Sequence, residues 1–333
     1  MVLPRTDTRA ASDRRLPVTN RLTAGQTITL VHLSDPHINC MNTVRVQDLF
    51  SKRIFGYSRW KLHRSAEHGT GVLAALQEDL AQTKPDHIAV TGDLTHLSLP
   101  AEFIKARQWL QSLGPSDRVT VIPGNHDAYV KNGWRQGWGG WIGYMLGDES
   151  GDVEYAARRP ESIFPSLRVR GPMALIGVCT ARPSALHLAV GTVGPGQLQK
   201  LETVLAQASK AQLYRVLLIH HPPAPGTVSW RKRLTDADAL QSLIARRGAE
   251  LILHGHAHRV LHNYLKTPGD RAPVMGAPSV SAIGRTPERR ARYYIYRITP
   301  GTKGWDVELT VRIYSMNRNC FITESEQRIS SRG

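Results

Sequence analysis

Several strand-length runs of apolar and β-branched residues in this chain end directly in Asp, Asn or His. Five of them, at 28–33, 87–91, 119–122, 215–219 and 250–253, are followed by SDPH, GDLT, PGNHD, HHPP and HGHAH. Segments with helical periodicity lie between several of the runs, so the sequence predicts an α/β fold. Open α/β sheets gather the carboxyl ends of their strands at one edge, and we expect these polar side chains to converge there.

The expected helices span 71–83, 101–113, 197–211 and 236–247, and a further strand is expected at 174–179. After residue 270 the pattern changes to successive strands at 273–283, 293–298 and 307–313, with no helix between them. This change predicts a mixed sheet or a second sheet.

One domain is predicted over residues 27–330, after a basic extension at 1–26. The extension carries five Arg and two Asp without an apolar stretch, which argues against a secretory signal. Two long connections, 38–70 and 128–170, match no regular element. We predict that they are cap-like insertions, because such long connections in a compact domain are usually functional.

The excess of positive charge fits either a solvated basic surface or attraction to an anionic partner. The 43 Lys and Arg exceed the 27 Asp and Glu, which gives a formal charge of +16. A phosphorylated metabolite, a nucleic acid and an acidic membrane surface all fit this charge. No uncharged apolar run is long enough for a membrane-spanning helix, and the three cysteines are far apart. We therefore expect a cytoplasmic protein, with contact to a membrane surface as an option.

The residues at the strand ends suit metal ions. Imidazole, carboxylate and amide ligands without thiolate favour Mn, Fe, Zn, Co or Ni over Cu(I) or an iron–sulfur cluster. The donors are too many for one tetrahedral site, so they predict two divalent ions that share a carboxylate. Such a pair would activate water for attack on phosphorus.

The ordered motifs resemble those of the calcineurin-like metallophosphoesterase superfamily. They are D-x-H at 35–37, G-D at 92–93, G-N-H-D at 124–127, H-H-P-P at 220–223 and G-H-x-H at 255–258. The resemblance covers about residues 27–260 and implies a four-layer α/β/β/α sandwich of two mixed sheets flanked by helices. It also implies the metal ligands Asp35, His37, Asp93, Asn125, His220, His256 and His258. Asp93 would bridge the two ions, and His126 would act on the leaving group as general acid or hydrogen-bond donor.

One position departs from the protein phosphatase branch of this superfamily. There a carboxylate three residues after the G-D aspartate orients the catalytic histidine, whereas this chain has His96. Asp127 is the alternative candidate for that role. The departure favours the small-molecule phosphodiesterase branch.

The predicted activity is hydrolysis of a phosphodiester or pyrophosphate by a metal-bridging hydroxide. A cyclic nucleotide, a glycerophosphodiester and a nucleotide-sugar lipid are all admissible substrates. A nuclease and a non-catalytic binding scaffold on the same fold are the alternatives. A nuclease would bind DNA with strong salt dependence, and a scaffold would carry no stoichiometric metal.

Two aromatic segments have open roles. The segment 51–61 mixes cations with aromatic residues, and it is either a basic surface helix and loop or a cap that binds the substrate. In the second case Arg53 and Arg59 are candidate phosphate donors. His96 is a further candidate contact to the substrate. Trp134, Trp138 and Trp141 could form a small satellite core, or an amphipathic lid that contacts an acyl chain, a membrane or a base.

Overall fold

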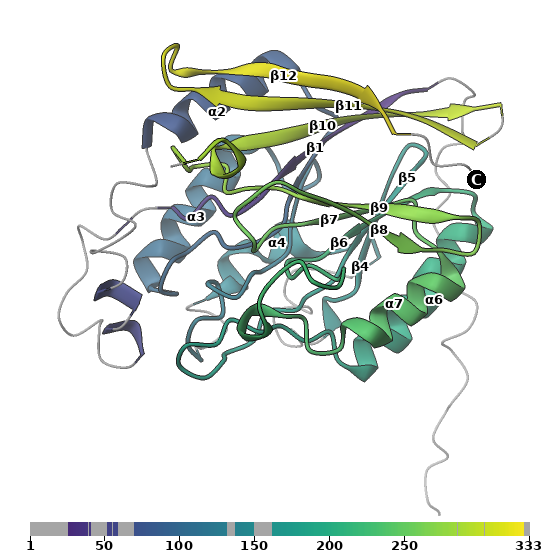
Figure 1. Cartoon of the computed structure of the whole chain (residues 1–333), viewed down its shortest axis with the longest axis horizontal. Helices are drawn as coiled ribbons and strands as arrows, with labels where there is room; N and C mark the ends of the chain where they lie inside the picture. Colours follow the sequence, from purple (N-terminus) through teal and green to yellow (C-terminus); the bar gives the residue numbers. More distant parts are fainter. Residues whose placement is uncertain are drawn as a thin grey trace, which may run out of the picture.

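The computed structural model describes residues 26–38, 40, 52–54, 56–58, 70–131, 137–149, 162–284, 286–302 and 304–329. Within them, the strands form two six-stranded mixed sheets that face each other (Figure 1). The first sheet has the order β12-β11-β10-β1-β2-β3, and the second has the order β4-β5-β6-β7-β9-β8.

The first sheet joins a parallel half to an antiparallel half. Strands β1, β2 and β3 are parallel, and β10 pairs antiparallel with β1 and continues antiparallel through β11 to β12. The strands are β1 Ile28–Leu33, β2 His87–Val90, β3 Val119–Val121, β10 Arg292–Gly301, β11 Gly304–Ser315 and β12 Cys320–Arg328.

The second sheet has a parallel centre, β5-β6-β7-β9, and antiparallel strands β4 and β8 at its edges. The strands are β4 Ser166–Arg170, β5 Met173–Gly177, β6 Tyr214–Leu218, β7 Leu251–His254, β8 Leu261–Lys266 and β9 Arg271–Gly276.

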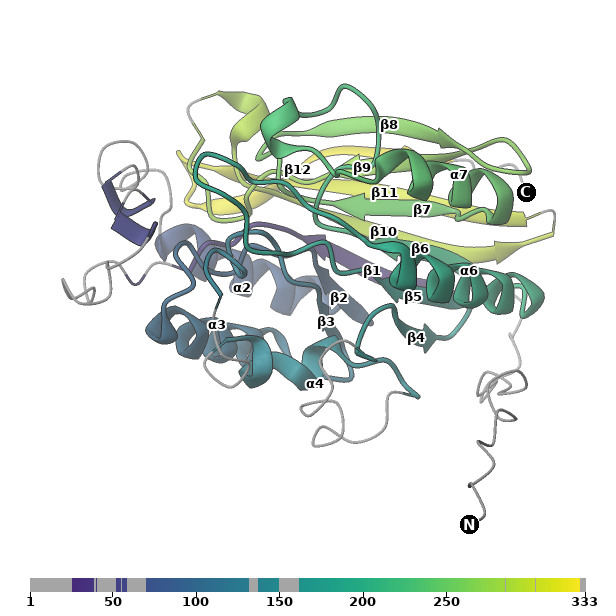
Figure 2. The ribbon, with the colours of Figure 1, turned by 90° about the horizontal axis from the view of Figure 1, so that it is seen from below.

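Helices cover the outer faces of both sheets. Figures 1 and 2 show α6 and α7 on the side of the second sheet and α2 and α3 beside β1–β3. The helices are α2 Thr70–Thr83, α3 Pro100–Leu113, α4 Ile142–Met145, α6 Pro195–Lys210 and α7 Ala237–Arg247. Three short 3-10 helices lie at Trp138–Trp141, Trp230–Lys232 and Pro287–Arg289. No described helix is long and apolar enough to cross a bilayer.

Strand alternation explains the layers. On β6, Val216 and Leu218 belong to the apolar cluster between the sheets, whereas Leu217 belongs to the cluster under α6 and α7. Successive side chains of a strand point to opposite faces, so a fully apolar strand can be buried on both sides. The predicted four-layer arrangement of two mixed sheets and flanking helices is confirmed.

The predicted elements need some corrections. The strand expected at 273–283 ends at Gly276, after which the chain turns toward the first sheet, where Val280 N donates to Ser34 O. Strands β4, β8 and β12 were not predicted. Each carries polar residues at many positions, as expected for strands at or near a sheet edge.

The tryptophan segment belongs to the main core in its described part. Trp141 is fully buried against Phe103, and its Nε1 donates to the Phe103 carbonyl. Trp138 packs partly buried on the same cluster and donates to the Asp127 carbonyl. Trp134 lies outside the described residues. Neither a satellite core nor a lipid-facing lid therefore describes Trp138 and Trp141.

Candidate metal centre and active-site cleft

The loops after β1 and β2 run side by side beyond the ends of the strands. Backbone N–H groups of Asp35, His37 and Ile38 donate to the carbonyls of Gly92, Asp93 and Leu94 at 3.0, 3.1 and 2.8 Å. These bonds continue the parallel ladder into the loops and fix Asp35, His37 and Asp93 relative to one another.

Glycines allow the remaining loops to approach. A Cβ on Gly124 would lie 2.2 Å from Asp93 Oδ1, and a Cβ on Gly255 would lie 1.9 Å from Ser34 Oγ. Any other residue at either position would push two of the loops apart.

The candidate ligands include an unusual number of left-handed residues. Asp35, His37, Asp93, His256 and His258 all have positive φ, between 42° and 68°. They make up half of the ten described non-glycine residues with positive φ. Strained backbone of this kind concentrates at functional sites, because the surrounding structure must hold it.

The first group of candidate ligands is Asp35, His37, Asp93 and His258, whose ligand atoms lie within 4.8 Å of one another. Nε2 of His258 is 3.1 Å from His37 Nε2 and 3.1 Å from Asp35 Oδ1. Asp35 Oδ2 accepts hydrogen bonds from Ser34 Oγ and from the backbone N–H of His256. That arrangement directs Oδ1 toward the histidines.

The second group is Asp93, His220 and His256, so Asp93 belongs to both groups. Asn125 Oδ1 lies 3.1 Å from His220 Nε2 and 2.7 Å from His256 Nδ1. The structure thus brings all seven predicted ligands together, and their role as ligands remains a prediction.

Backbone carbonyls orient the imidazoles. His37 Nδ1 and His220 Nδ1 donate to the carbonyls of Thr95 and Thr91, which leaves Nε2 of each ring facing the centre. His256 is reversed, because its Nε2 donates to the Lys232 carbonyl and its Nδ1 faces Asn125. Such outer hydrogen bonds fix the tautomer of a metal-binding histidine.

Burial and mutual proximity control the protonation of these groups. Burial and the neighbouring histidines hold the pKa values of His37 and His256 well below the usual range, so both rings are neutral, as metal binding requires. Burial alone would raise the pKa of Asp93, but His220, His126 and His37 hold it well below its usual value. Burial opposes protonation of His220, yet Asp93 raises its pKa to about 9.

These residues fit a pair of divalent cations. Two ligand atoms that each lie about 2.1 Å from one ion are about 3–3.5 Å apart. The His37–His258 and His220–Asn125 pairs have that spacing. Asp35 Oδ1 is buried and accepts no hydrogen bond from any described residue.

His126 lies beside this centre, and a backbone carbonyl holds its ring. Its backbone N–H donates to Asp93 Oδ1 at 2.8 Å, and its Nδ1 donates to the His96 carbonyl at 2.6 Å. The His96 ring stacks on His37 with centroids 4.7 Å apart. His96 therefore contributes its carbonyl to His126 and its ring to the packing of a candidate ligand.

Asp127 connects two loops. Its carboxylate accepts hydrogen bonds from Thr95 N, Thr95 Oγ1 and Gly124 N. Burial and the charge of Asp93 raise the pKa of Asp127 to about 7. Its carboxylate thus holds the Thr95 side chain and two backbone N–H groups, a geometry that suits a positioning role.

Arg53 also contacts backbone. Its guanidinium donates to the carbonyls of Leu97 and Ser98 at 3.0 and 2.7 Å and does not line the described cleft. Arg59 lies outside the described residues. Nearby, Lys52 stacks over Tyr129 and donates to the Ser184 carbonyl, so part of the 38–70 connection borders the site.

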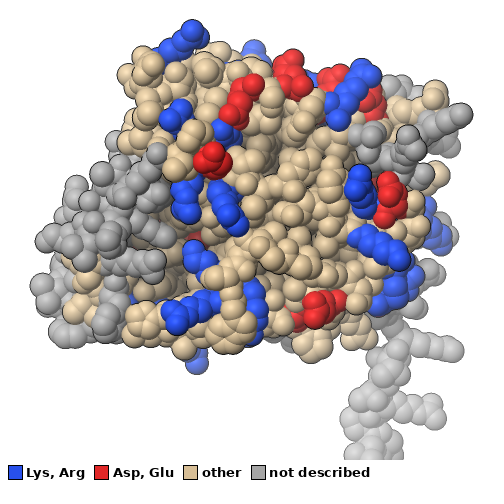
Figure 3. All heavy atoms as spheres, viewed as in Figure 1, with Lys and Arg blue, Asp and Glu red and all other residues tan. Residues whose placement is uncertain are grey.

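A cleft of about 500 Å³ opens over the candidate ligands. Its lining includes Leu97, Tyr129, Ser184 and residues 186–189, and Arg231 and Lys232 also border it. On the face drawn in Figure 3, the described Lys and Arg side chains form separate groups, with acidic and uncharged surface between them. The described side chains on this face therefore form no continuous basic band of the kind that contacts a nucleic acid backbone.

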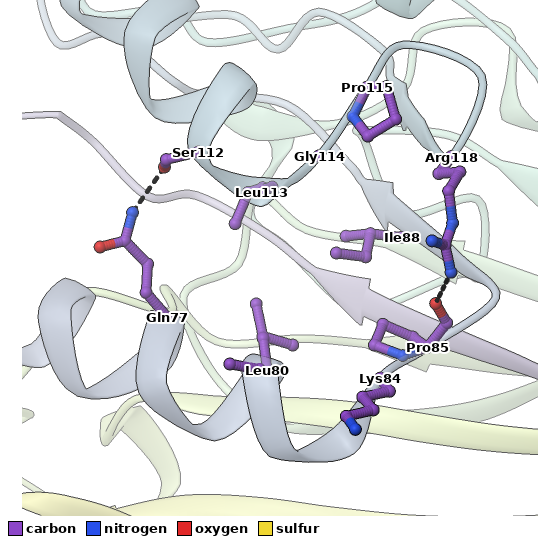
Figure 4. A pocket seen from close by; sticks show the side chains of 11 residues that line it. Gln77, Leu80, Lys84, Pro85, Ile88, Ser112, Leu113, Gly114, Pro115 and Arg118 are labelled. Atoms are coloured by element: carbon purple, nitrogen blue, oxygen red, sulfur yellow. Dashed lines mark hydrogen bonds between the residues drawn. The ribbon is translucent and has the colours of Figure 1, made fainter.

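A second hollow lies at the opposite end of the first sheet. Figure 4 shows Leu80, Leu113 and Ile88 around it, with the Gln77–Ser112 hydrogen bond at its margin. Its described lining contains no His, Cys, Asp or Glu. The chemistry is therefore assigned to the cleft over the histidines.

Sequence reasoning missed several residues of the site. Glu102, Ser34 and Tyr129 each contact the loops that carry the ligands or His126. Only Glu102 had a readable signal, since a Glu two residues after a Pro that starts a helix commonly bonds back to the preceding loop.

Comparison with known proteins agrees with this geometry. A family model described as calcineurin-like phosphoesterase matches residues 28–260. The chain belongs to this family. Two proteins named as probable cyclic nucleotide phosphodiesterases, from two strains of Synechococcus sp., are 25% and 24% identical over 230 and 261 residues. These matches cover 68% and 75% of this chain, and 77% and 81% of the relatives.

Among solved structures, a dimetal phosphatase from Danio rerio shares the fold. It has a TM-score of 0.57 at 12% identity, and the match covers 89% of this chain and 98% of that protein. Membership of the calcineurin-like phosphoesterase family identifies the chain as a hydrolase of phosphoric esters with a candidate metal-ligand cluster at the strand ends.

Proposed function

We propose that this calcineurin-like phosphoesterase is a phosphodiesterase for a small anionic substrate, with a cyclic nucleotide as the first candidate. One observation carries the proposal: two groups of candidate ligands share Asp93, and His126 lies directly beside that residue. The names of the two Synechococcus relatives support the cyclic nucleotide. The cleft volume also supports it, because about 500 Å³ suits a small molecule.

The ligands proposed for the first ion are Asp35, His37, Asp93 and His258, and those proposed for the second are Asp93, Asn125, His220 and His256. When bound, two such ions would lower the pKa of a water between them and neutralise charge on the phosphoryl oxygens. Mn, Fe, Zn, Co and Ni all suit this ligand set.

The side chains of the cleft would then bind and protonate the substrate. Arg231 and Lys232 attract the phosphodiester anion. His126 has its Nδ1 committed to the His96 carbonyl, so we assign Nε2 to the leaving oxygen, as proton donor or hydrogen-bond donor. Asp127 holds the loops of Asp93 and His126 together.

A substrate panel tests this proposal. Purified protein loaded with Mn²⁺ would be assayed on cyclic AMP, cyclic GMP, a glycerophosphodiester, a UDP-linked lipid pyrophosphate, bis(p-nitrophenyl) phosphate and a phosphomonoester. We expect the highest kcat/KM on a cyclic nucleotide, and a strongly reduced but measurable kcat for His126→Ala on that substrate. Faster hydrolysis of monoesters than of every diester would overturn the phosphodiesterase proposal, and fastest cleavage of the lipid pyrophosphate would replace the cyclic nucleotide.

A further inference from the structure

A buried carboxylate holds the loop between β2 and α3. Glu102 is fully buried, and its Oε2 accepts the backbone N–H groups of Leu97 and Leu99 at 3.0 and 2.9 Å. Its Oε1 accepts the N–H of His96 at 2.9 Å. Because α3 begins with Pro100, Glu102 lies in the first turn and its side chain reaches back over the loop.

One peptide unit of this loop connects Glu102 to His126. The N–H of the peptide between His96 and Leu97 donates to Glu102, and the carbonyl of the same peptide accepts the His126 Nδ1 hydrogen bond at 2.6 Å. We propose that Glu102 is a positioning residue that acts on His126 through this peptide. The inference rests on the proposed function only for its effect on turnover.

The physical effect is polarisation. A peptide N–H that donates to a charged acceptor shifts electron density toward its own carbonyl oxygen, which makes that oxygen a stronger acceptor. The effect is large in a buried site, where water does not screen it. The peptide would therefore hold the His126 ring with Nδ1 protonated and keep Nε2 available for the leaving oxygen.

The charge of Glu102 is present at neutral pH. Burial raises the pKa of this carboxyl to about 6, although three backbone hydrogen bonds and Arg53 act in the opposite direction. Arg53 holds the same loop from its other side through the Leu97 and Ser98 carbonyls. Ser98 Oγ in turn donates to the His126 carbonyl at 2.7 Å.

The competing interpretation is that Glu102 only caps α3. A cap affects stability and disturbs every reaction of the site alike. A positioning residue for His126 instead affects reactions in proportion to their need for His126. Leaving groups of different basicity separate the two, because an alkoxide needs help from an acid far more than p-nitrophenolate does.

The experiment is a double-mutant cycle of Glu102→Gln and His126→Ala on an alkyl and a p-nitrophenyl phosphodiester. We expect Glu102→Gln to lower kcat about tenfold on the alkyl diester, which corresponds to about 1.4 kcal/mol of activation free energy. On the p-nitrophenyl diester kcat should fall much less. In the His126→Ala background the same change should have no further effect. Equal losses on both substrates, or a further loss without His126, would overturn the proposal.

Asp79→Asn is the matched control. Asp79 is also a buried carboxylate, but it lies on α2 and accepts hydrogen bonds from Tyr293 and Arg312 instead of from the loop of His96. Its neutralisation should lower stability without changing the ratio of the two rates. A ratio that moves equally in Asp79→Asn and Glu102→Gln would mean that general loosening is the cause.

A second measurement does not depend on turnover. In protein with ¹⁵N-labelled histidine and no added metal, the His126 Nδ1–H resonance would be assigned by its loss in His126→Ala. We expect Glu102→Gln to move it upfield and speed its exchange with water, and Asp79→Asn to leave it in place. If the resonance does not move in Glu102→Gln, the proposed action of Glu102 on His126 is overturned, even in an active enzyme. If the resonance moves but the protein is inactive on every phosphodiester, only the proposed function is refuted.

If Glu102→Gln does not fold, Glu102→Asp takes its place. It keeps the charge and draws the carboxylate back by one methylene. A weakened contact should again move the resonance upfield, and a folded variant with the wild-type resonance would overturn the proposal.

Discussion

Acid should unfold this protein because histidines outside the candidate ligand groups are buried in the neutral form. His87 on β2 is fully buried, with Nε2 2.8 Å from Thr120 Oγ1. Burial, followed by the charges of Arg168, Arg170 and Arg118, lowers its pKa from 6.5 to about 3. Below pH 6.5 the unfolded state therefore binds a proton at His87 that the folded state does not bind. The stabilisation that comes from burying His87 in the neutral form is complete above pH 6.5 and is lost as the pH falls.

The magnitude follows from the two pKa values. Between pH 7 and pH 5 the unfolded histidine becomes protonated while folded His87 stays neutral, which lowers the free energy of unfolding by about 2 kcal/mol. His32, whose pKa burial and His254 lower to about 3, should add a similar loss. Together they would remove about 4 kcal/mol, a large part of the stability of an ordinary domain.

Urea unfolding at pH 5, 6, 7 and 8, followed by tryptophan fluorescence with chelator in every sample, measures this loss. His87→Gln should lower stability at pH 7 but lose about 2 kcal/mol less than wild type on going to pH 5. His187→Gln removes an exposed histidine and is the control; it should lose as much unfolding free energy as wild type between pH 7 and pH 5. If His87→Gln and wild type lost the same free energy between pH 7 and pH 5, the buried neutral histidine would not be the cause.

Three further outcomes are expected. Chelation should lower the denaturation temperature and Mn²⁺ should restore it, because a ligand at 100 times its Kd adds about 2.7 kcal/mol of stability. A denaturation temperature that calorimetry finds unchanged by chelator and by Mn²⁺ would contradict a metal centre. Asp93→Asn should reduce the bound metal per chain, measured by elemental analysis, and lower kcat at least about a hundredfold. If the variant holds two ions and turns over at the wild-type rate, Asp93 is not a ligand shared by both. Arg231→Ala should raise KM about tenfold with little change in kcat, because Arg231 lines the cleft but belongs to neither group of candidate ligands. An unchanged KM at low salt would remove Arg231 from substrate binding.

The convergence of the candidate ligands was predictable because these residues follow buried strands directly. Asp35, Asp93 and His220 each come within three residues of the end of an apolar run, and the parallel pairing of β1 with β2 and of β6 with β7 gathers them at common edges. The sequence also predicted both ends of four helices to within two residues, because each helix buries one apolar face. These helices are α2, α3, α6 and α7.

The rest depended on contacts between distant segments. The sequence shows Arg53 as a cation in a basic stretch, but its partners are carbonyls about 45 residues away along the chain. Trp141 reads as part of an amphipathic stripe among glycines, and only the packing of α3 reveals that Phe103 buries it. Strand β8 alternates exposed polar residues with half-buried ones, a weak signal for an edge strand.

The hydrogen-bonded continuation of β1 and β2 into their loops bears on metal exchange. Those bonds join main chain to main chain and do not require an ion, so the loops that carry Asp35, His37 and Asp93 should persist in the empty protein. Metals would then enter and leave a preformed receptor, and its fixed geometry would contribute to which ion is retained.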